Sequence, residues 1–363
     1  MSEAWESAVN ASDFERLASE RLEAAVFGYF AGGAADEVTL RENPLAWRRW
    51  RLRPRVLVDV SAVSTEARIL GGPCSMPIGV APVAFQKLVD PQGEVAMARA
   101  VAAAGTVMSL STIATSRPSE VAAGAPGGRR FFQLYRFRDE GVTRALMEEA
   151  IGSGFEAILL TVDAPLVGRR ESDLRTRFAV PGDLGVPSLE AALGGGRSVS
   201  PGEVFAQVDA SLVWEDLDDL AASCEVPVLL KGVLTAEDAA LAMQHGAAGV
   251  VVSNHGGRQL DCAPATADAL PEVVEAMEGR GTVLVDGGIR RGTDVAVALA
   301  LGADGVMVGR PALWGLAAGG EAGARRVLEM LREELSLALA LCGCASPAEL
   351  GRRHLVRAPV AGP

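Results

Sequence analysis

A histidine, an arginine and an aspartate lie close together in the stretch 248–261, AGVVVSNHGGRQLD. The small apolar run Gly249 to Val252 predicts a buried parallel strand, and His255, Arg258 and Asp261 follow its end. An imidazole can accept a proton near neutral pH, and a guanidinium can bind a carboxylate. Because parallel α/β folds place their chemistry at the carboxyl ends of strands, this stretch is a candidate active site. A turn that merely contains a histidine is the alternative.

Other predicted strands also end in residues that suit a binding site, which argues against that alternative. Charged and amide groups on otherwise apolar strands are costly unless they are paired or bind a ligand. Together these strand ends predict one polar face. Its members outside 248–261 are Pro82, Val83, Ala84, Ser109, Ser111, Gln133, Tyr135, Thr161, Asp163 and Lys231, and Ser253 joins them from within that stretch.

Glycines and arginines follow the last two predicted strands, in the sequences DGGIRRG and GRP. The residues are Asp286, Gly287, Gly288, Arg290, Gly309 and Arg310. Backbone N–H groups freed by glycine, together with arginines, are typical of a phosphate site after strands seven and eight of a barrel. The amide and hydroxyls of Gln133, Thr161 and Ser111 suit the polar edge of a flat heterocycle, and Lys231 suits an oxyanion on it. A phosphorylated flat ring points to flavin mononucleotide (FMN).

The elements that must position these residues repeat as strand, turn and helix. Eight such units predict a closed (β/α)8 barrel, an α/β fold. The expected strands are 78–83, 106–111, 131–135, 157–163, 226–232, 249–255, 282–288 and 305–310, and the expected helices are 93–104, 139–152, 214–223, 235–246, 266–278, 293–301 and 321–342. We expect an N-terminal extension over 1–76, a barrel over 77–345 and a tail over 346–363, all in one domain.

Two segments outside the repeat have their own patterns. Residues 12–31 have apolar residues at helical spacing, and Ser12 with Glu15 predicts a capping box. Residues 40–70 lack periodicity and are expected to be irregular. The connection after strand four is far longer than an ordinary loop of about 4–6 residues, so we expect a lid over the active face, mobile at about 182–202.

The composition excludes several classes of protein. The 363 residues are 49% hydrophobic, and the net charge of −12 argues against nucleic acid as a partner. The start is polar and acidic and no apolar run could span a bilayer, so neither a signal peptide nor a membrane anchor is expected. Five scattered cysteines suit a reducing cytoplasm, and no structural metal site is expected. His245 and His354 lie in a helical segment and in the tail, away from the predicted strand ends.

The chain resembles the FMN-dependent 2-hydroxy acid oxidases and dehydrogenases, such as glycolate oxidase, lactate oxidase and mandelate dehydrogenase. The resemblance covers about 12–355 and includes GYFAGGAADE, APVAFQK, RFFQLY, LTVDAPLVGRRE, LLKGVLTAEDA, SNHGGRQLD, DGGIRRGTDV and VGRP. It implies a small-molecule 2-hydroxy acid substrate, dioxygen or another electron acceptor, and a homotetramer or homo-octamer.

The resemblance also implies a role for each matching residue. His255 would be the active-site base, with Asp163 supporting its cation, and Tyr135 would contact the substrate hydroxyl or carboxylate. Tyr29, Arg170 and Arg258 would hold the substrate carboxylate. The cofactor residues would be Pro82, Val83 and Ala84 against the flavin, Ser111, Gln133, Thr161 and Ser253 on its polar edge, Lys231 on the reduced ring, and Asp286, Gly287, Gly288, Arg290, Gly309 and Arg310 around the phosphate.

Substrate size and electron acceptor remain hypotheses at this stage. Ile113 and Val167 replace bulkier pocket residues of glycolate-oxidising relatives, which favours an (S)-2-hydroxy acid larger than glycolate, mandelate-like, 4-hydroxymandelate-like or medium-chain aliphatic. Ala84 stands where some acceptor-linked relatives have glycine, which favours an oxidase producing hydrogen peroxide. The alternatives are an acceptor-linked dehydrogenase acting on lactate or glycolate, a flavin-free barrel enzyme using Lys231 as a Schiff base, and a catalytically silent binding protein.

Overall fold

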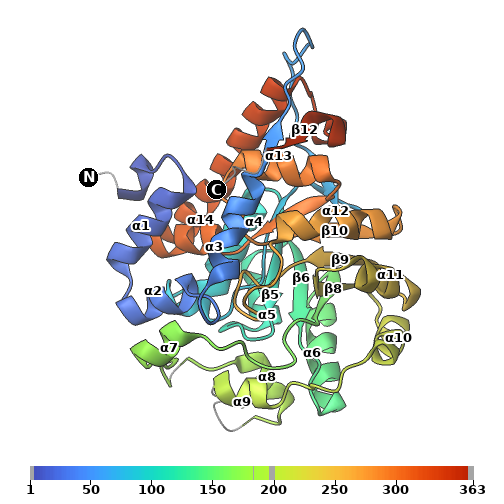
Figure 1. Cartoon of the computed structure of the whole chain (residues 1–363). Coiled ribbons are helices and arrows are strands. Elements are labelled where there is room, and N and C mark those ends of the chain that lie inside the picture. Colours follow the sequence, from blue (N-terminus) through green and yellow to red (C-terminus); the bar gives the residue numbers. More distant parts are fainter. Residues whose placement is uncertain (1–3, 183, 196–200, 359–363) are drawn as a thin grey trace.

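A computed structural model shows a closed barrel of eight parallel strands wrapped by helices (Figure 1). It describes residues 4–182, 184–195 and 201–358. Every strand of the predicted barrel is present, which confirms the (β/α)8 fold. Around the barrel the strands are β4 (Ile78–Val80), β5 (Val107–Ser111), β6 (Arg129–Leu134), β7 (Ala157–Thr161), β8 (Val228–Val233), β9 (Gly249–Val252), β10 (Thr282–Val285) and β11 (Gly305–Val308), and β11 pairs back to β4.

The helices form the outer layer. In Figure 1 the N-terminal helices lie beside the last long helix, α14, which contacts α1. Their bounds are α1 Ala11–Arg21, α2 Ala24–Ala31, α3 Val38–Trp47, α4 Gly93–Ala103, α5 Pro118–Gly124, α6 Glu140–Gly152, α7 Glu171–Thr176, α8 Pro187–Ala192, α9 Pro201–Ala206, α10 Trp214–Ser223, α11 Ala236–Gln244, α12 Thr266–Met277, α13 Gly292–Leu301 and α14 Arg310–Cys342.

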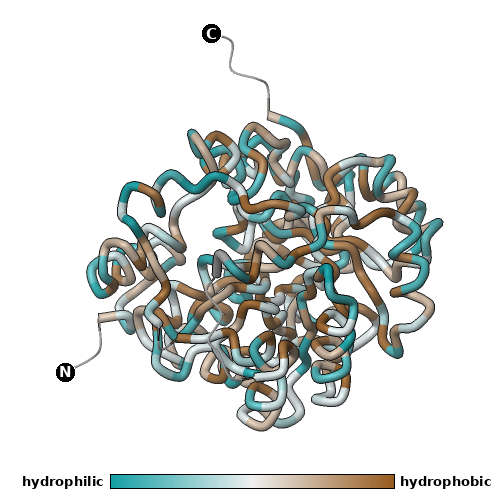
Figure 2. The backbone as a smooth tube through the Cα atoms, turned by 90° about the horizontal axis from the view of Figure 1, so that it is seen from below, coloured by the Kyte–Doolittle hydropathy of each residue, from teal (hydrophilic) through white to brown (hydrophobic). Residues whose placement is uncertain are grey.

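Two apolar layers hold the barrel together. Alternate strand residues point to opposite faces, so Leu159 and Leu229 belong to the cluster inside the barrel while Leu160 and Leu230 pack outward against the helices. Figure 2 shows hydrophobic stretches running through the interior of the view and many hydrophilic turns on its periphery. Short antiparallel pairs lie outside the barrel, β1 (Trp50–Leu52) with β12 (Leu355–Arg357) and β2 (Ala67–Ile69) with β3 (Gly72–Cys74).

The expected helix over 12–31 is wrong in two respects. It is two helices, α1 and α2, which Leu22 and Glu23 separate in extended conformations. The N-cap is Asn10, whose Oδ1 accepts hydrogen bonds from the backbone N–H groups of Ser12 (2.8 Å) and Asp13 (3.1 Å). The predicted cap, Ser12, lies inside the first turn. An asparagine side-chain oxygen accepts from orphan N–H groups as well as a serine hydroxyl does, so residue preference alone does not exclude Asn10 as the cap.

Because Asn10 is the cap, two alanine variants are expected to differ in their free energy of unfolding. Asn10→Ala is expected to lower the free energy of unfolding by about 1 kcal/mol, the usual cost of losing a capping side chain. Ser12→Ala, the matched control, is expected to leave it nearly unchanged. Urea unfolding followed by circular dichroism measures both, and a larger loss for Ser12→Ala would contradict the assignment.

One other expectation is corrected. Part of the segment expected to be irregular forms α3, which tolerates Pro44 near its middle. The expected final helix, 321–342, is confirmed as the second part of α14, because Gly319 and Gly320 have non-helical backbone angles and separate it from a first part that begins at Arg310. His354 is buried in the tail, where its Nε2 lies 3.6 Å from Sγ of Cys344. Of the segment expected to be mobile, residues 183 and 196–200 lie outside the described residues, and the rest includes α8.

Candidate active site

A cavity of about 1060 Å³, partly open to solvent, lies at the carboxyl ends of the barrel strands. Its lining of apolar side chains with a few charged and amide groups suits a small-molecule or cofactor site. Most of the predicted site residues line it. They are Tyr29, Pro82, Val83, Ala84, Ser111, Ile113, Gln133, Tyr135, Thr161, Arg170, Lys231, His255, Arg258, Asp286, Gly287, Gly288, Arg290, Gly309 and Arg310.

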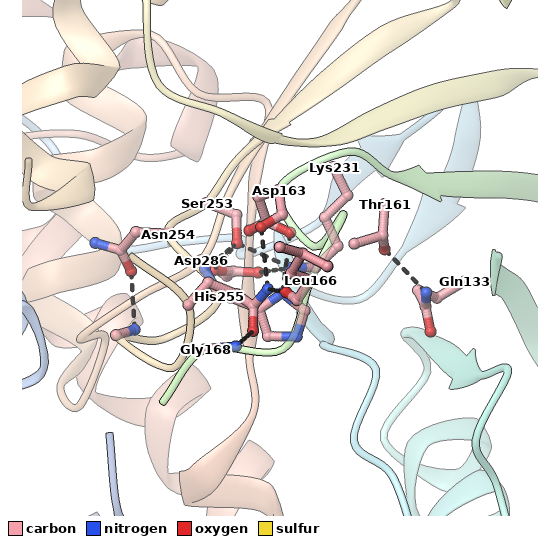
Figure 3. Close-up of polar contacts among 12 residues, drawn as sticks. Gln133, Thr161, Asp163, Leu166, Gly168, Lys231, Ser253, Asn254, His255 and Asp286 are labelled. Carbon is pink, nitrogen blue, oxygen red and sulfur yellow. Dashed lines mark hydrogen bonds and ion pairs between the residues drawn. The ribbon is translucent and has the colours of Figure 1, made fainter. Parts of the chain in front are cut away.

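The candidate base His255 is held by an aspartate behind it (Figure 3). Its Nδ1 lies 3.0 Å from Oδ1 of Asp163, and its backbone N–H donates to Oγ of Ser253 at 3.1 Å. Burial alone would raise the pKa of the Asp163 carboxyl, but the charge and hydrogen bond of His255, with the charge of Lys231, hold that pKa below its ordinary value. An ionised Asp163 favours a proton on Nδ1, which leaves Nε2 as the proton acceptor. This arrangement suits general base catalysis.

Gln259 supports this pair and was missed by the sequence analysis. Its Nε2 donates to the backbone oxygens of Asp163 (3.1 Å) and Leu166 (2.8 Å), and its Oε1 accepts from the N–H of Gly168 at 3.1 Å. The amide therefore joins the loop after β9 to the loop after β7. Its position in SNHGGRQLD was the available signal, since it follows the histidine on the same loop.

Replacing Gly232 by alanine is expected to lower the activity strongly. Its φ is +115°, and a Cβ there would lie 2.6 Å from Cβ and Cγ of Asp163. Gly232→Ala should therefore displace the carboxylate and lower kcat/KM about a hundredfold, because small misplacements of catalytic groups are that costly. Gly246→Ala is the matched control, since Gly246 also has positive φ (+79°) but the new Cβ would meet only Ala221 at 3.5 Å. Equal losses in steady-state assays of both variants would contradict this explanation.

Lys231 forms a buried charged network with β9 and β10. Its Nζ lies 3.0 Å from Oδ2 of Asp286 and donates to Oγ of Ser253 at 2.8 Å, and that hydroxyl donates to Oδ1 of Asp286 at 2.7 Å. Burial alone would lower the pKa of Lys231, but Asp286 and Asp163 raise it above its ordinary value. A permanently protonated amine suits an oxyanion partner. It does not suit the Schiff-base alternative, which needs a neutral amine.

The expected role of Asp286 changes with this network. We expected it beside the phosphate, but its carboxylate neutralises Lys231, and a second anion would repel a phosphate. Ser253 likewise lies behind Lys231 and is fully buried. The sequence placed both residues at the correct strand ends but could not show which neighbours they would pair with.

An amide and two hydroxyls form the opposite wall. Nε2 of Gln133 donates to Oγ1 of Thr161 at 2.9 Å, and Oε1 of Gln133 accepts from Oγ of Ser111 at 3.2 Å. This network orients Gln133 in the cavity. Its groups suit the polar edge of a flat heterocycle, as the sequence indicated.

The loops after β10 and β11 suit a phosphate. Gly287 and Gly288 have φ of +94° and +83°, and a Cβ on Gly288 would lie 2.4 Å from the backbone carbon of Asn43. Helix α14 begins at Arg310, so the free N–H groups of its first turn and its dipole face this end of the cavity. Arg290 adds a guanidinium to the lining. The donors therefore fit the phosphate of FMN.

We expected the side chain of Arg310 at the phosphate, but it binds backbone oxygens of the protein instead. It donates to three backbone oxygens, those of Phe30 (2.8 Å), Gly32 (2.9 Å) and Gly256 (2.9 Å). Burial, followed by the charges of Arg258 and Arg290, lowers its pKa to about 9. These contacts join the carboxyl end of α2 to the loop that carries His255. The backbone N–H of Arg310 remains the group that suits a phosphate.

Two partly buried arginines form a candidate carboxylate site. Arg258 lies over the ring of Tyr29, with its guanidinium carbon 5.0 Å from the ring centre, and its Nη1 donates to the backbone oxygen of Gly32 at 2.9 Å. Burial, then the charge of Arg170, lowers the pKa of Arg258 to about 10. Nε of Arg170 is buried without an acceptor among the described residues. Two close cations with unused donors suit a bidentate carboxylate.

Aromatic side chains complete the mouth. Burial, then the charge of Asp163, raises the pKa of Tyr135, so its hydroxyl stays protonated and can donate a hydrogen bond. The ring of Phe205, from α9, packs edge-on against Tyr135 with centroids 5.7 Å apart. Phe178 stacks on Tyr29 at 4.4 Å. Neither phenylalanine was predicted, because each lies far along the chain from the barrel strand before it and is part of no local motif.

One predicted wall residue is wrong. Ile113 is buried and lines the cavity, as expected. Val167 is 45% exposed and is not among the described residues that line the cavity. The loop after β7 turns it outward while Gln259 holds the backbone on either side.

Helix α3, which was not predicted, buttresses the site. Asn43 exchanges two hydrogen bonds with Asn254 (2.9 and 2.8 Å), and Nε1 of Trp47 donates to the backbone oxygen of Gly287 at 2.8 Å. Asp261 accepts from the N–H of Thr39 at 2.9 Å, which anchors the start of the helix. The extension thus fixes the loops after both β9 and β10.

These features define a class, the (β/α)8 oxidoreductases that hold a phosphorylated flavin at the carboxyl ends of their strands. The chain belongs to the FMN-dependent dehydrogenase family, whose model matches residues 18–357, and FMN is its cofactor. It is 51% identical to glycolate oxidase 3 of Arabidopsis thaliana and 50% identical to glycolate oxidase of Spinacia oleracea, each over 95% of both chains. A structure of mandelate oxidase with (S)-4-hydroxymandelic acid superposes with a TM-score of 0.91 at 41% identity, covering 97% of this chain and all of that one.

Proposed function

We propose that this protein oxidises an (S)-2-hydroxy acid to the 2-oxo acid, with dioxygen as the final electron acceptor and hydrogen peroxide as the second product. The observation that carries the proposal is the pair Arg258 and Arg170, two partly buried cations that line the cavity with the His255 base, where Nε of Arg170 has no acceptor among the described residues. Bound FMN supplies the two-electron acceptor for such a reaction. The 2-hydroxy acid oxidases among the relatives support the same substrate class.

Each side chain of the site has its own role in the proposed reaction. Arg258, Arg170 and Tyr29 hold the substrate carboxylate and so present the 2-hydroxy carbon to the base. His255 accepts a proton, and the ionised Asp163 behind it stabilises the resulting imidazolium. Tyr135 donates a hydrogen bond to the hydroxyl or carboxylate. Two routes fit this geometry, proton removal from the carbon and proton removal from the hydroxyl with hydride transfer.

Substrates larger than glycolate fit the cavity best in our proposal. Ile113 leaves more room than an aromatic wall would, and the rings of Phe205 and Tyr135 offer apolar contacts to a side chain. Loss of Val167 from the wall weakens the steric argument but does not reverse it. Glycolate itself is the second candidate, because the glycolate oxidases are about half identical to this chain.

A substrate panel tests the proposal. Flavin bleaching without oxygen is measured with glycolate, (S)-lactate, 2-hydroxyoctanoate and both enantiomers of mandelate, followed by kcat/KM under air. We expect the highest kcat/KM for an (S)-mandelate-like or medium-chain acid. Highest kcat/KM on glycolate would overturn the size argument, and no bleaching with any acid would overturn the function.

The electron acceptor needs a separate measurement. Ala84 lines the cavity, and an alanine there, where some acceptor-linked relatives have glycine, supports the oxidase hypothesis. We expect one hydrogen peroxide per 2-oxo acid under air. Slow reoxidation with little peroxide, together with rapid turnover on an artificial acceptor, would favour the acceptor-linked dehydrogenase.

A cytoplasmic location and a homotetramer or homo-octamer complete the proposal. Among the described residues no helix has the length and apolarity to cross a membrane. The tip formed by Val56, Leu57 and Val58 is 81%, 103% and 44% exposed, which favours association with another copy. Light scattering of the FMN-loaded protein checks the mass, and a monomer would contradict the assembly.

A further inference from the structure

A second cavity lies outside the barrel, between β7, β8 and α10. It holds about 1220 Å³ of empty space, part of it open to solvent, and is at least as large as the active-site cavity. Leu160 and Leu230 form its inner wall, and Trp214 and Leu217 of α10 form its outer wall. In Figure 1, α10 lies on the periphery beside α11. This cavity plays no part in the function proposed above.

The cavity exists because α10 stands away from the barrel. Helices α4, α6, α11, α12 and α13 each pack closely on a neighbouring strand, whereas α10 makes only sparse contacts with other elements in the described part of the chain. Protein interiors are packed nearly as densely as organic crystals, and empty apolar volume costs stability. A gap lined by leucine, valine and tryptophan is therefore a place where an apolar occupant would be favourable.

One polar group in the wall lacks a partner. Arg136 lines the cavity, and its Nη2 pairs with Glu140 at 2.8 Å and Asp216 at 3.8 Å. Its Nε is buried and finds no acceptor among the described residues. A buried donor without an acceptor is destabilising, so an occupant that offers an oxygen would recover part of that loss.

The charges around the cavity decide between a neutral and an anionic ligand. Glu140 and Asp216 already balance Arg136, and Asp209 and Asp238 also line the cavity. A carboxylate would meet this surplus of negative charge, whereas a neutral carbonyl oxygen would not. We propose that this cavity is a second binding site for a neutral, largely apolar molecule that carries one carbonyl oxygen, which accepts a hydrogen bond from Nε of Arg136.

The site adjoins the support of the catalytic base. Gly232 and Ala164 line this cavity, and they are in contact with, or next in sequence to, Asp163. Thr161 borders both cavities. A ligand in the second cavity would therefore contact the segment that positions Asp163.

Three probes of similar shape separate the contributions. Acetophenone has a neutral carbonyl, ethylbenzene lacks the oxygen, and benzoate carries a charge. Binding to the FMN-loaded enzyme is followed by the change in Trp214 fluorescence, with Trp214→Phe identifying the signal. We expect saturable binding of acetophenone, about tenfold or more tighter than ethylbenzene, because the donor is a charged guanidinium and such a hydrogen bond is stronger than a neutral one. Benzoate should bind more weakly than acetophenone in this cavity.

Two arginine variants locate the hydrogen bond. Arg136→Met keeps the apolar stem, and it should reduce acetophenone affinity to that of ethylbenzene. Arg138→Met, the matched control from the same loop, should leave it unchanged, because Arg138 is exposed and is not among the described residues that line the cavity. Leu217→Trp should fill the cavity and remove binding of both neutral probes.

The outcomes that overturn the proposal are definite. They are a fluorescence change that does not saturate, equal affinities for acetophenone and ethylbenzene, tighter binding of benzoate, or full retention of acetophenone binding in Arg136→Met. Thermal unfolding shows whether each variant is folded. If Arg136→Met does not fold, Arg138→Met and Leu217→Trp still test the proposal. Because the readout needs no turnover, failure here is independent of the proposed oxidation.

Discussion

His255→Ala is expected to lower the rate constant of flavin reduction by substrate about a thousandfold or more while FMN stays bound. His255 is the group that accepts a proton in the proposed reaction, and a positioned general base contributes about 10²–10⁴-fold. Its loss also leaves Asp163 without its partner, since the 3.0 Å contact to Nδ1 is the one side-chain hydrogen bond of that carboxylate among the described residues. Anaerobic stopped-flow absorbance measures the rate, and the flavin spectrum of the purified variant shows whether the cofactor is retained.

The control for this variant is another histidine of the chain. His245 ends α11 and lies 3.0 Å from Oδ1 of Asp218, with its ring stacked on Trp214, so His245→Ala should leave flavin reduction unchanged. Reduction of the flavin in His255→Ala at near the original rate would remove His255 from the mechanism. Loss of FMN from that variant alone would instead show that the loop after β9 serves mainly to hold the cofactor.

The barrel and the composition of its mouth could be predicted because their signals are local. Apolar runs such as Gly249 to Val252 form buried strands whatever sequence flanks them. Polar residues at the carboxyl ends of parallel strands all lie at one rim of the barrel. Lys231, Gln133 and Tyr135 therefore reached the cavity as predicted. The resemblance added the roles of residues from the N-terminal extension, such as Tyr29, which no strand pattern could place.

The errors concern partners that only the folded chain brings together. The side chain of Asp286 pairs with Lys231, from the strand two positions away in the barrel, and its place beside glycines and an arginine gave no sign of that partner. Helix α3 was missed because Pro44 breaks its pattern, yet the helix is held by contacts from Asn43 and Trp47 to the site. Val167 was placed in the wall by the resemblance to glycolate-oxidising relatives, whereas the structure leaves it 45% exposed.

Arg258→Met is expected to lower kcat/KM about a hundredfold or more. Arg258 is a partly buried cation that lines the cavity beside Arg170, and losing one charged partner of a substrate carboxylate held there costs about 2–5 kcal/mol. Arg258→Lys should give an intermediate loss, because an ammonium keeps the charge but cannot form two parallel hydrogen bonds. Arg169→Met, at an exposed neighbouring arginine (73%), should change little. Steady-state kinetics and the thermal unfolding midpoint separate binding from folding.

A carboxamide substrate distinguishes recognition of charge from general damage to the site. The amide of the preferred 2-hydroxy acid has the same shape and no charge, so the original enzyme should strongly favour the acid while Arg258→Met should favour it far less. Arg258 also donates to the backbone oxygen of Gly32, so its removal loosens α2, and that effect should slow both substrates equally. If Arg258→Met keeps the full preference for the acid, then Arg170 alone binds the carboxylate. The buried Nε of Arg170 is the unused donor that would remain.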